Sequence, residues 1–70
     1  MKIETTCRCI NELVFEDYHG EKHKFLPIRE YQVDETYTNG CVTYVVYLTG
    51  GFDLNVTLSK DEFREYFKLI

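Results

Sequence analysis

The clearest hydrophobic pattern lies in the C-terminal part of the chain. Apolar side chains follow the i, i+3, i+4, i+7 spacing of an amphipathic helix at Phe63, Tyr66, Phe67 and Ile70. Ser59 and Glu62 have the spacing of a capping box, in which the serine oxygen accepts an N–H of the first turn and the glutamate reaches back. The pattern therefore predicts an amphipathic helix from about Lys60 to Leu69.

Two strands are predicted before this helix. Residues 52–58 alternate between apolar and polar without interruption, which is typical of a half-buried strand. Residues 41–49 are rich in β-branched and aromatic types, and the stretch 36–52 contains no charged residue. Because an uncharged strand on an open edge would aggregate, the strand over 41–49 is predicted to lie in the centre of a sheet.

Glycine-containing turns predict how these strands pair. Asn39-Gly40 is typical of a type I′ turn in a two-residue hairpin. At Gly50-Gly51 a two-residue loop would place the apolar residues of the next strand on the opposite face from those of its neighbours. A three-residue loop over 50–52 pairs Val46 with Val56 and gathers all apolar residues on one face, so it is the predicted register.

The N-terminal half predicts three shorter strands over 3–10, 12–17 and 21–26, and Pro27 ends the third. We therefore expect a single domain over 1–70 of the α+β class, mostly β. The predicted architecture is a small bent antiparallel β-meander or partly open barrel of about five to six strands with one C-terminal amphipathic helix. The pattern leaves open whether the sheet closes into a barrel.

Composition adds the expected environment. Hydrophobic residues make up 44% of the chain, aromatic residues 16% and charged residues 29%, a balance that excludes intrinsic disorder. No apolar run approaches the ~20 residues of a membrane-spanning helix. The N-terminus lacks the apolar region of a signal peptide, so we expect a cytoplasmic protein whose three cysteines are reduced.

Charge and motifs exclude several functions. The net charge of −4 and the scattered basic residues argue against direct nucleic-acid binding, which needs a basic patch. A single-stranded nucleic-acid binder remains an alternative, since bases can stack on exposed aromatic rings, although such proteins normally also have a positive groove. The sequence contains no nucleophile elbow, P-loop or HExxH motif, so neither an enzyme nor a cofactor is predicted.

Cysteine and histidine residues provide a second alternative, a zinc-stabilised module. Zinc takes four such ligands in a tetrahedron, and the candidates are Cys7, Cys9, His19, His23 and Cys41. A Cys-x-Cys spacing in a strand points both thiols to one face, but it is not the usual knuckle spacing. The simpler interpretation is that Cys7 and Cys9 are small buried core residues.

The six tyrosines favour protein binding, because tyrosine offers a large contact area with a polar tip. One predicted strand carries an acidic, aromatic strip that consists of Glu30, Tyr31, Asp34, Glu35 and Tyr37. Such a strip suits a basic protein partner, including the nucleic-acid-binding groove of another protein, and solvated surface is the alternative. The leading hypothesis is a small protein-binding module, an inhibitor or accessory protein of the kind found in phages and mobile elements. A homodimer built on a sheet edge is a further alternative.

Overall fold

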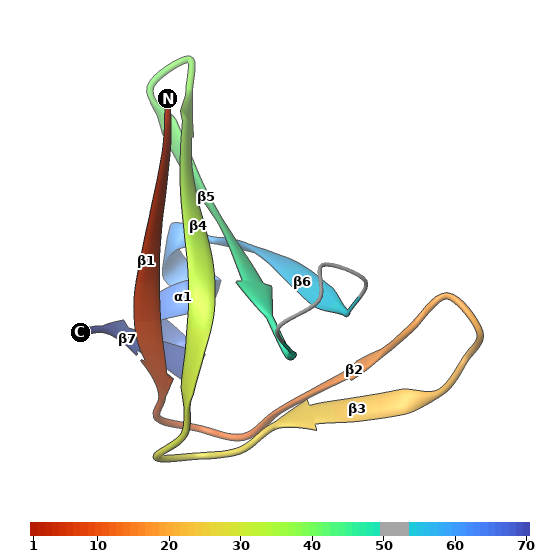
Figure 1. Ribbon diagram of the computed structural model, residues 1–70. Helices are drawn as coiled ribbons and strands as arrows, with labels where there is room; N and C mark the ends of the chain where they lie inside the picture. Colours follow the sequence, from red (N-terminus) through yellow and green to blue (C-terminus); the bar gives the residue numbers. More distant parts are fainter. Residues whose placement is uncertain (50–53) are drawn as a thin grey trace.

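The structure is a computed structural model that describes residues 1–49 and 54–70 (Figure 1). Its elements are β1 (Lys2–Cys9), β2 (Leu13–Glu16), β3 (Lys22–Phe25), β4 (Glu30–Thr38), β5 (Cys41–Tyr47), β6 (Asn55–Ser59), α1 (Lys60–Tyr66) and β7 (Phe67–Leu69). Five strands of the described part form one antiparallel sheet in the order β6-β5-β4-β1-β7, and β2 and β3 form a separate hairpin. The large sheet is bent into a half-barrel, so the predicted mostly β fold with a C-terminal helix is confirmed.

The sheet gathers its apolar residues on one face, as the pattern predicts. Thr5, Val33, Val46 and Val56 lie opposite one another in turn across four strands. Val33 and Val46 are fully buried at the centre of this row. Strand β5 lies between β4 and β6, which confirms the prediction that the uncharged strand is central.

Both predicted strand pairings around β5 are confirmed. Asn39 and Gly40 have positive φ angles of 51° and 80°, as a type I′ turn requires at both central positions. Val46 pairs with Val56, and the N–H of Leu48 donates to the carbonyl of Leu54 at 2.9 Å. The predicted three-residue loop over 50–52 itself lies outside the described residues.

Helix α1 begins as predicted but ends earlier. The Ser59 hydroxyl accepts the Glu62 N–H and the Glu62 carboxylate accepts the Ser59 N–H, which confirms the capping box. The predicted end at Leu69 is wrong, because the helix ends at Tyr66 and β7 follows directly. Residues 67–69 instead form hydrogen bonds along the edge of β1 that β4 leaves free, where Phe67 lies opposite Cys9. The helix in the described ranges is too short to span a membrane.

Aromatic rings connect the hairpin, the sheet and the helix. Phe25 of β3 is fully buried and meets Phe67 edge-to-face, with ring centroids 5.2 Å apart. Phe67 in turn lies 5.6 Å from Phe63 of α1, and Phe63 stacks on Tyr44 of β5 at 4.0 Å. Figure 1 shows the β2–β3 hairpin extending from one end of the sheet, so the buried side chain of Phe25 ties it to the rest of the fold.

This arrangement predicts that Phe25→Ala lowers the free energy of unfolding by about 3–5 kcal/mol, through lost burial and a residual cavity. A single core of this size supplies only ~3–5 kcal/mol, so the variant should be largely unfolded in urea titrations followed by circular dichroism. Val14→Ala is the matched control on the same hairpin, because Val14 is 53% exposed. A transition like that of the wild type for Phe25→Ala would contradict the central role of this ring.

Candidate functional site

The predicted acidic strip does not form one surface. Alternation along β4 places Glu30 and Asp34 on one face of the sheet and Tyr31, Glu35 and Tyr37 on the other. Asp34 is only 3% exposed and Glu35 only 8%. The prediction of a single exposed acidic strip is therefore wrong, because neighbouring residues of a strand point in opposite directions and the two central acids are buried.

The two buried acids serve as hydrogen-bond acceptors inside the protein. The Tyr47 hydroxyl donates to Asp34 at 2.6 Å, and the Tyr37 hydroxyl donates to Glu35 at 2.5 Å. These bonds to carboxylates, aided by partial burial, raise the pKa values of Tyr37 and Tyr47. Lys2 lies 3.7 Å from Asp34 and offsets its charge. These carboxylates are therefore engaged within the fold, with Asp34 Oδ1 left without a hydrogen-bond partner, and their charge is not presented to another protein.

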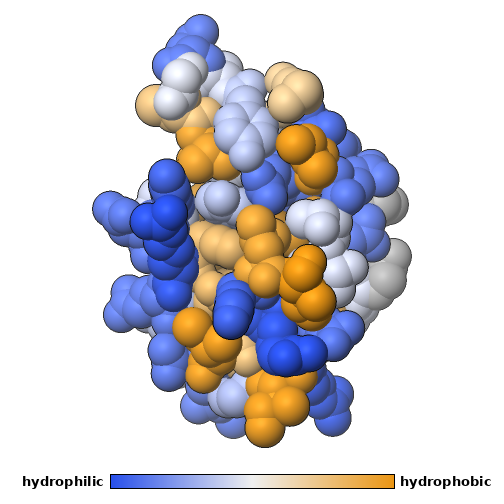
Figure 2. All heavy atoms as spheres, turned by 90° about the vertical axis from the view of Figure 1, so that its left-hand side faces the viewer, coloured by the Kyte–Doolittle hydropathy of each residue, from blue (hydrophilic) through white to orange (hydrophobic). Residues whose placement is uncertain are grey.

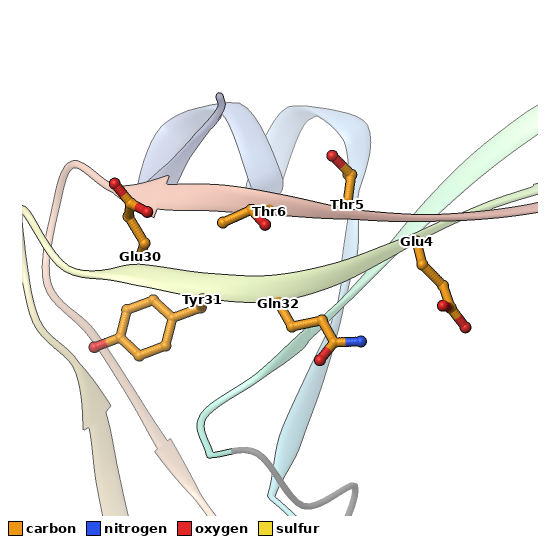
Figure 3. A pocket seen from close by; sticks show the side chains of 6 residues that line it. All are labelled: Glu4, Thr5, Thr6, Glu30, Tyr31 and Gln32. Carbon is orange, nitrogen blue, oxygen red and sulfur yellow. The ribbon is translucent and has the colours of Figure 1, made fainter.

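The other two members of the strip also have partners within the fold. The Tyr31 hydroxyl accepts the Leu26 N–H at 2.9 Å, and Glu30 pairs with Arg8 at 3.1 Å on the surface. A polar recess of about 330 Å³ lies beside them. Figure 3 shows that its side chains spread along β1 and β4 without converging on one point, so they do not assemble a binding site: Glu4, Thr5, Thr6, Glu30, Tyr31 and Gln32.

The predicted zinc set is not brought together. Cys7 and Cys9 are buried on the core face of β1, whereas Cys41 and His19 are exposed at the turns of two different hairpins. Burial raises the pKa of Cys7 to about 12 and also raises the pKa of Cys9. Both thiols are core residues whose burial disfavours the thiolate form. The zinc alternative with Cys7, Cys9, His19, His23 and Cys41 is thus not assembled among the described residues, and the simpler interpretation of Cys7 and Cys9 as buried core residues is confirmed.

His23 lies instead beside two acids of its own hairpin. Its Nε2 is 2.8 Å from Asp17, and the other oxygen of Asp17 accepts the backbone N–H groups of His19 and Glu21. The bond with His23 is the main cause that lowers the pKa of Asp17. Potential ligand atoms of Asp17, Glu21 and His23 lie within 4.8 Å of one another. The bonds made by Asp17 fix the hairpin loop, which explains why these groups lie close together.

An apolar hollow opens between α1, β7 and the residue that follows β1. This cavity, called the hollow below, has a volume of about 380 Å³. The residues that line it are Ile10, Tyr44, Phe63, Arg64, Phe67, Lys68 and Leu69. Ile10 is 45% exposed and Leu69 is 38% exposed, so apolar surface at its margin is open to solvent. Figure 2 views the side of the molecule on which β1 and β7 lie and shows apolar side chains exposed there, with strongly hydrophilic ones between them.

Two cationic side chains, Arg64 and Lys68, also line the hollow. Among the ion pairs of the described residues, none involves Arg64 or Lys68, although Lys2, Arg8 and Lys24 each pair with an acid. Burial raises the pKa of Tyr44 at the floor of the hollow, and the charge of Arg64 opposes that rise. The hollow therefore presents apolar rings beside positive charge in a chain whose net charge is −4.

The hollow was not predicted from the sequence pattern. Its residues come from three separate parts of the chain, and the predicted helix over 60–69 would have placed Lys68 in its last turn. The sequence does show apolar residues near both ends of the chain. The hydropathy pattern does not indicate, however, that Ile10 and Leu69 line the same hollow.

Comparison of the chain with protein-family models, with curated proteins and with solved structures finds no match. The fold makes it a small, mostly β half-barrel domain with an open apolar hollow beside two cations. A proposal for its function therefore depends on the chemistry of the hollow.

The thiol environments predict the reactivity of the native protein. Iodoacetamide at mildly alkaline pH should alkylate Cys41, which is exposed, and leave Cys7 and Cys9 unmodified. Cys7 is fully buried and its pKa of about 12 keeps it protonated under these conditions. Mass spectrometry of the digested protein reads each site, and labelling in concentrated guanidinium provides the control in which all three should react. Rapid alkylation of Cys7 in the native state would contradict its place in the core.

Proposed function

We propose that this chain is a small protein-binding module and that the hollow is its binding surface. One observation carries the proposal: exposed apolar side chains and aromatic rings lie directly beside Arg64 and Lys68, which have no ion-pair partner among the described residues. A fold of this size has few apolar residues for its core, so leaving Ile10 and Leu69 partly exposed is a cost that binding would offset.

The chemistry of the hollow indicates the partner. An apolar side chain of a partner would be removed from water against the rings, and a neighbouring carboxylate would approach the two cations. The proposed partner segment is therefore apolar and flanked by acids. This reverses the charge expected from the sequence, because the acids Asp34 and Glu35 are buried and unavailable to a basic partner. If the chain is an inhibitor or accessory protein, it would act by binding such a segment of its partner in the hollow.

The rings of the hollow favour a protein over a single-stranded nucleic acid. Tyr44 and Phe63 stack face to face, with 11° between their planes, so these two faces are already covered. Base stacking requires free ring faces, and nucleic-acid affinity requires several cations along a groove. Two cations beside an apolar floor match a short acidic and apolar protein segment better.

The proposal predicts that reversing the two cations abolishes partner capture. Arg64→Glu combined with Lys68→Glu should reduce the amount of captured partner about tenfold or more, because the partner's acids would face like charge. The measurement is quantitative mass spectrometry of proteins retained from cell extract by the immobilised chain. Circular dichroism checks that each variant is folded.

The matched control is Lys22→Glu combined with Lys60→Glu, which changes the net charge equally at residues that do not line the hollow. A protein retained equally by the wild-type chain and by both double variants would show that the hollow is not the binding surface.

A further inference from the structure

The connection between β3 and β4 holds an isoleucine in a backbone conformation that isoleucine rarely adopts. Ile28 has a φ angle of 76°. The Arg29 N–H donates to the Leu26 carbonyl at 3.4 Å, and Pro27 occupies the second position, which is the pattern of a type II turn. The third position of such a turn favours glycine or asparagine, because a Cβ atom is disfavoured in the left-handed region and a β-branched side chain most of all.

Packing within the fold does not offset this strain. Ile28 is 83% exposed, so its side chain gains little from the core. Glycine or asparagine at this position would remove both the strained backbone conformation and the exposed apolar surface. Strained residues that the fold does not require are typical of functional contacts. The side chain of Ile28 is therefore better explained by a contact with another molecule.

The turn adjoins the hollow. The Ile28 N–H donates to the Cys9 carbonyl at 2.8 Å. Cys9 is followed directly by Ile10, which lines the hollow. Ile10 is held there by its own N–H, which donates to the Tyr66 carbonyl at 2.7 Å. Figure 1 shows the connection between β3 and β4 passing close to the end of β1. A projecting apolar residue and an apolar hollow thus lie next to each other.

We propose that the hollow binds a second copy of this chain and receives its Ile28. The inference rests on the proposed function, since it names the partner of the same surface. A two-fold dimer requires one surface to supply both the projecting and the receiving group, and this surface supplies both. The turn also has the expected chemistry of the partner segment, because the acid Glu30 follows Ile28 by two residues and its side chain is 53% exposed.

The charges of the two copies fit this arrangement. Glu30 pairs with Arg8 on the surface, and an exposed pair of this kind contributes little to stability. In the dimer, Glu30 of one copy would approach Arg64 and Lys68 of the other, which have no ion-pair partner in the described part of the single chain. The contact would occur twice, once in each direction.

Sedimentation and light scattering of the pure chain over a wide concentration range test this inference. The wild-type chain should form a reversible dimer, and Ile28→Asn and Ile28→Gly should weaken it about tenfold or more. The same two variants should melt at a higher temperature than the wild type when all are diluted to monomers, because the turn is relieved of strain. Val14→Thr, at another exposed apolar position, should leave the dimer unchanged.

A mixing experiment tests whether Ile28 and the hollow meet across the interface. Leu69→Arg should block the hollow and, like Ile28→Asn, should dimerise only weakly when alone. An equal mixture of the two variants retains one intact contact, so native mass spectrometry should find a heterodimer stronger than either variant's self-association. A mixture that stays monomeric would show that Ile28 does not seat in the hollow.

The outcomes separate this inference from the proposed function. A wild-type chain that stays monomeric at all concentrations, or a dimer that Ile28→Asn does not weaken, overturns the inference. If such a chain still captures another protein through Arg64 and Lys68, the proposed function stands with a different partner. If it neither dimerises nor captures a protein through these residues, both proposals are wrong.

Discussion

The edge-to-face contact between Phe25 and Phe67 is the interaction on which the rest of the structure depends. Phe25 belongs to the separate β2–β3 hairpin, and Phe67 lies at the junction of α1 and β7. To place Phe67 against this ring and opposite Cys9, the chain must leave the helix at Tyr66 and extend along β1. The same contact therefore holds the hairpin against the rest of the fold and keeps Phe67 in the short strand that forms one wall of the hollow.

A chain of 70 residues without disulfides has little core with which to meet these constraints. Its three thiols are free, and two of them, Cys7 and Cys9, act as small core residues below the rings. Tyrosine hydroxyls donate to the buried acids Asp34 and Glu35 and offset part of the cost of burying them. Because the core is small, apolar surface stays exposed to solvent at the hollow and at Ile28. Association with another protein would remove that surface from water.

The sequence predicted the sheet well because alternation and turn chemistry are local. The requirement that Val46 and Val56 share a face was sufficient to choose the register of β5 and β6. The end of the helix was not predictable in the same way, because Phe63 and Phe67 fit a helical stripe whether or not the backbone stays helical beyond Tyr66. Only the free edge of β1 decides that question, and this edge is a tertiary feature.

The candidate site was less predictable for a related reason. Asp34 and Glu35 do not form one strip, because adjacent side chains of a strand point to opposite faces of the sheet. In addition, the hydroxyl of Tyr47, from the neighbouring strand, donates to Asp34. The hollow depends on tertiary contacts between Ile10, Tyr44 and Leu69, which are far apart in the chain. The strain at Ile28 is likewise visible only as a φ angle.

The contact between the hollow and Ile28 of a second copy is tested most directly by an isotope-filtered nuclear Overhauser experiment on a concentrated mixture of labelled and unlabelled chains. We expect contacts between the Ile28 methyl groups of one copy and the rings of Phe63 and Phe67 in the other. Contacts between copies that bypass the hollow, or none at all in a concentrated sample, would contradict it.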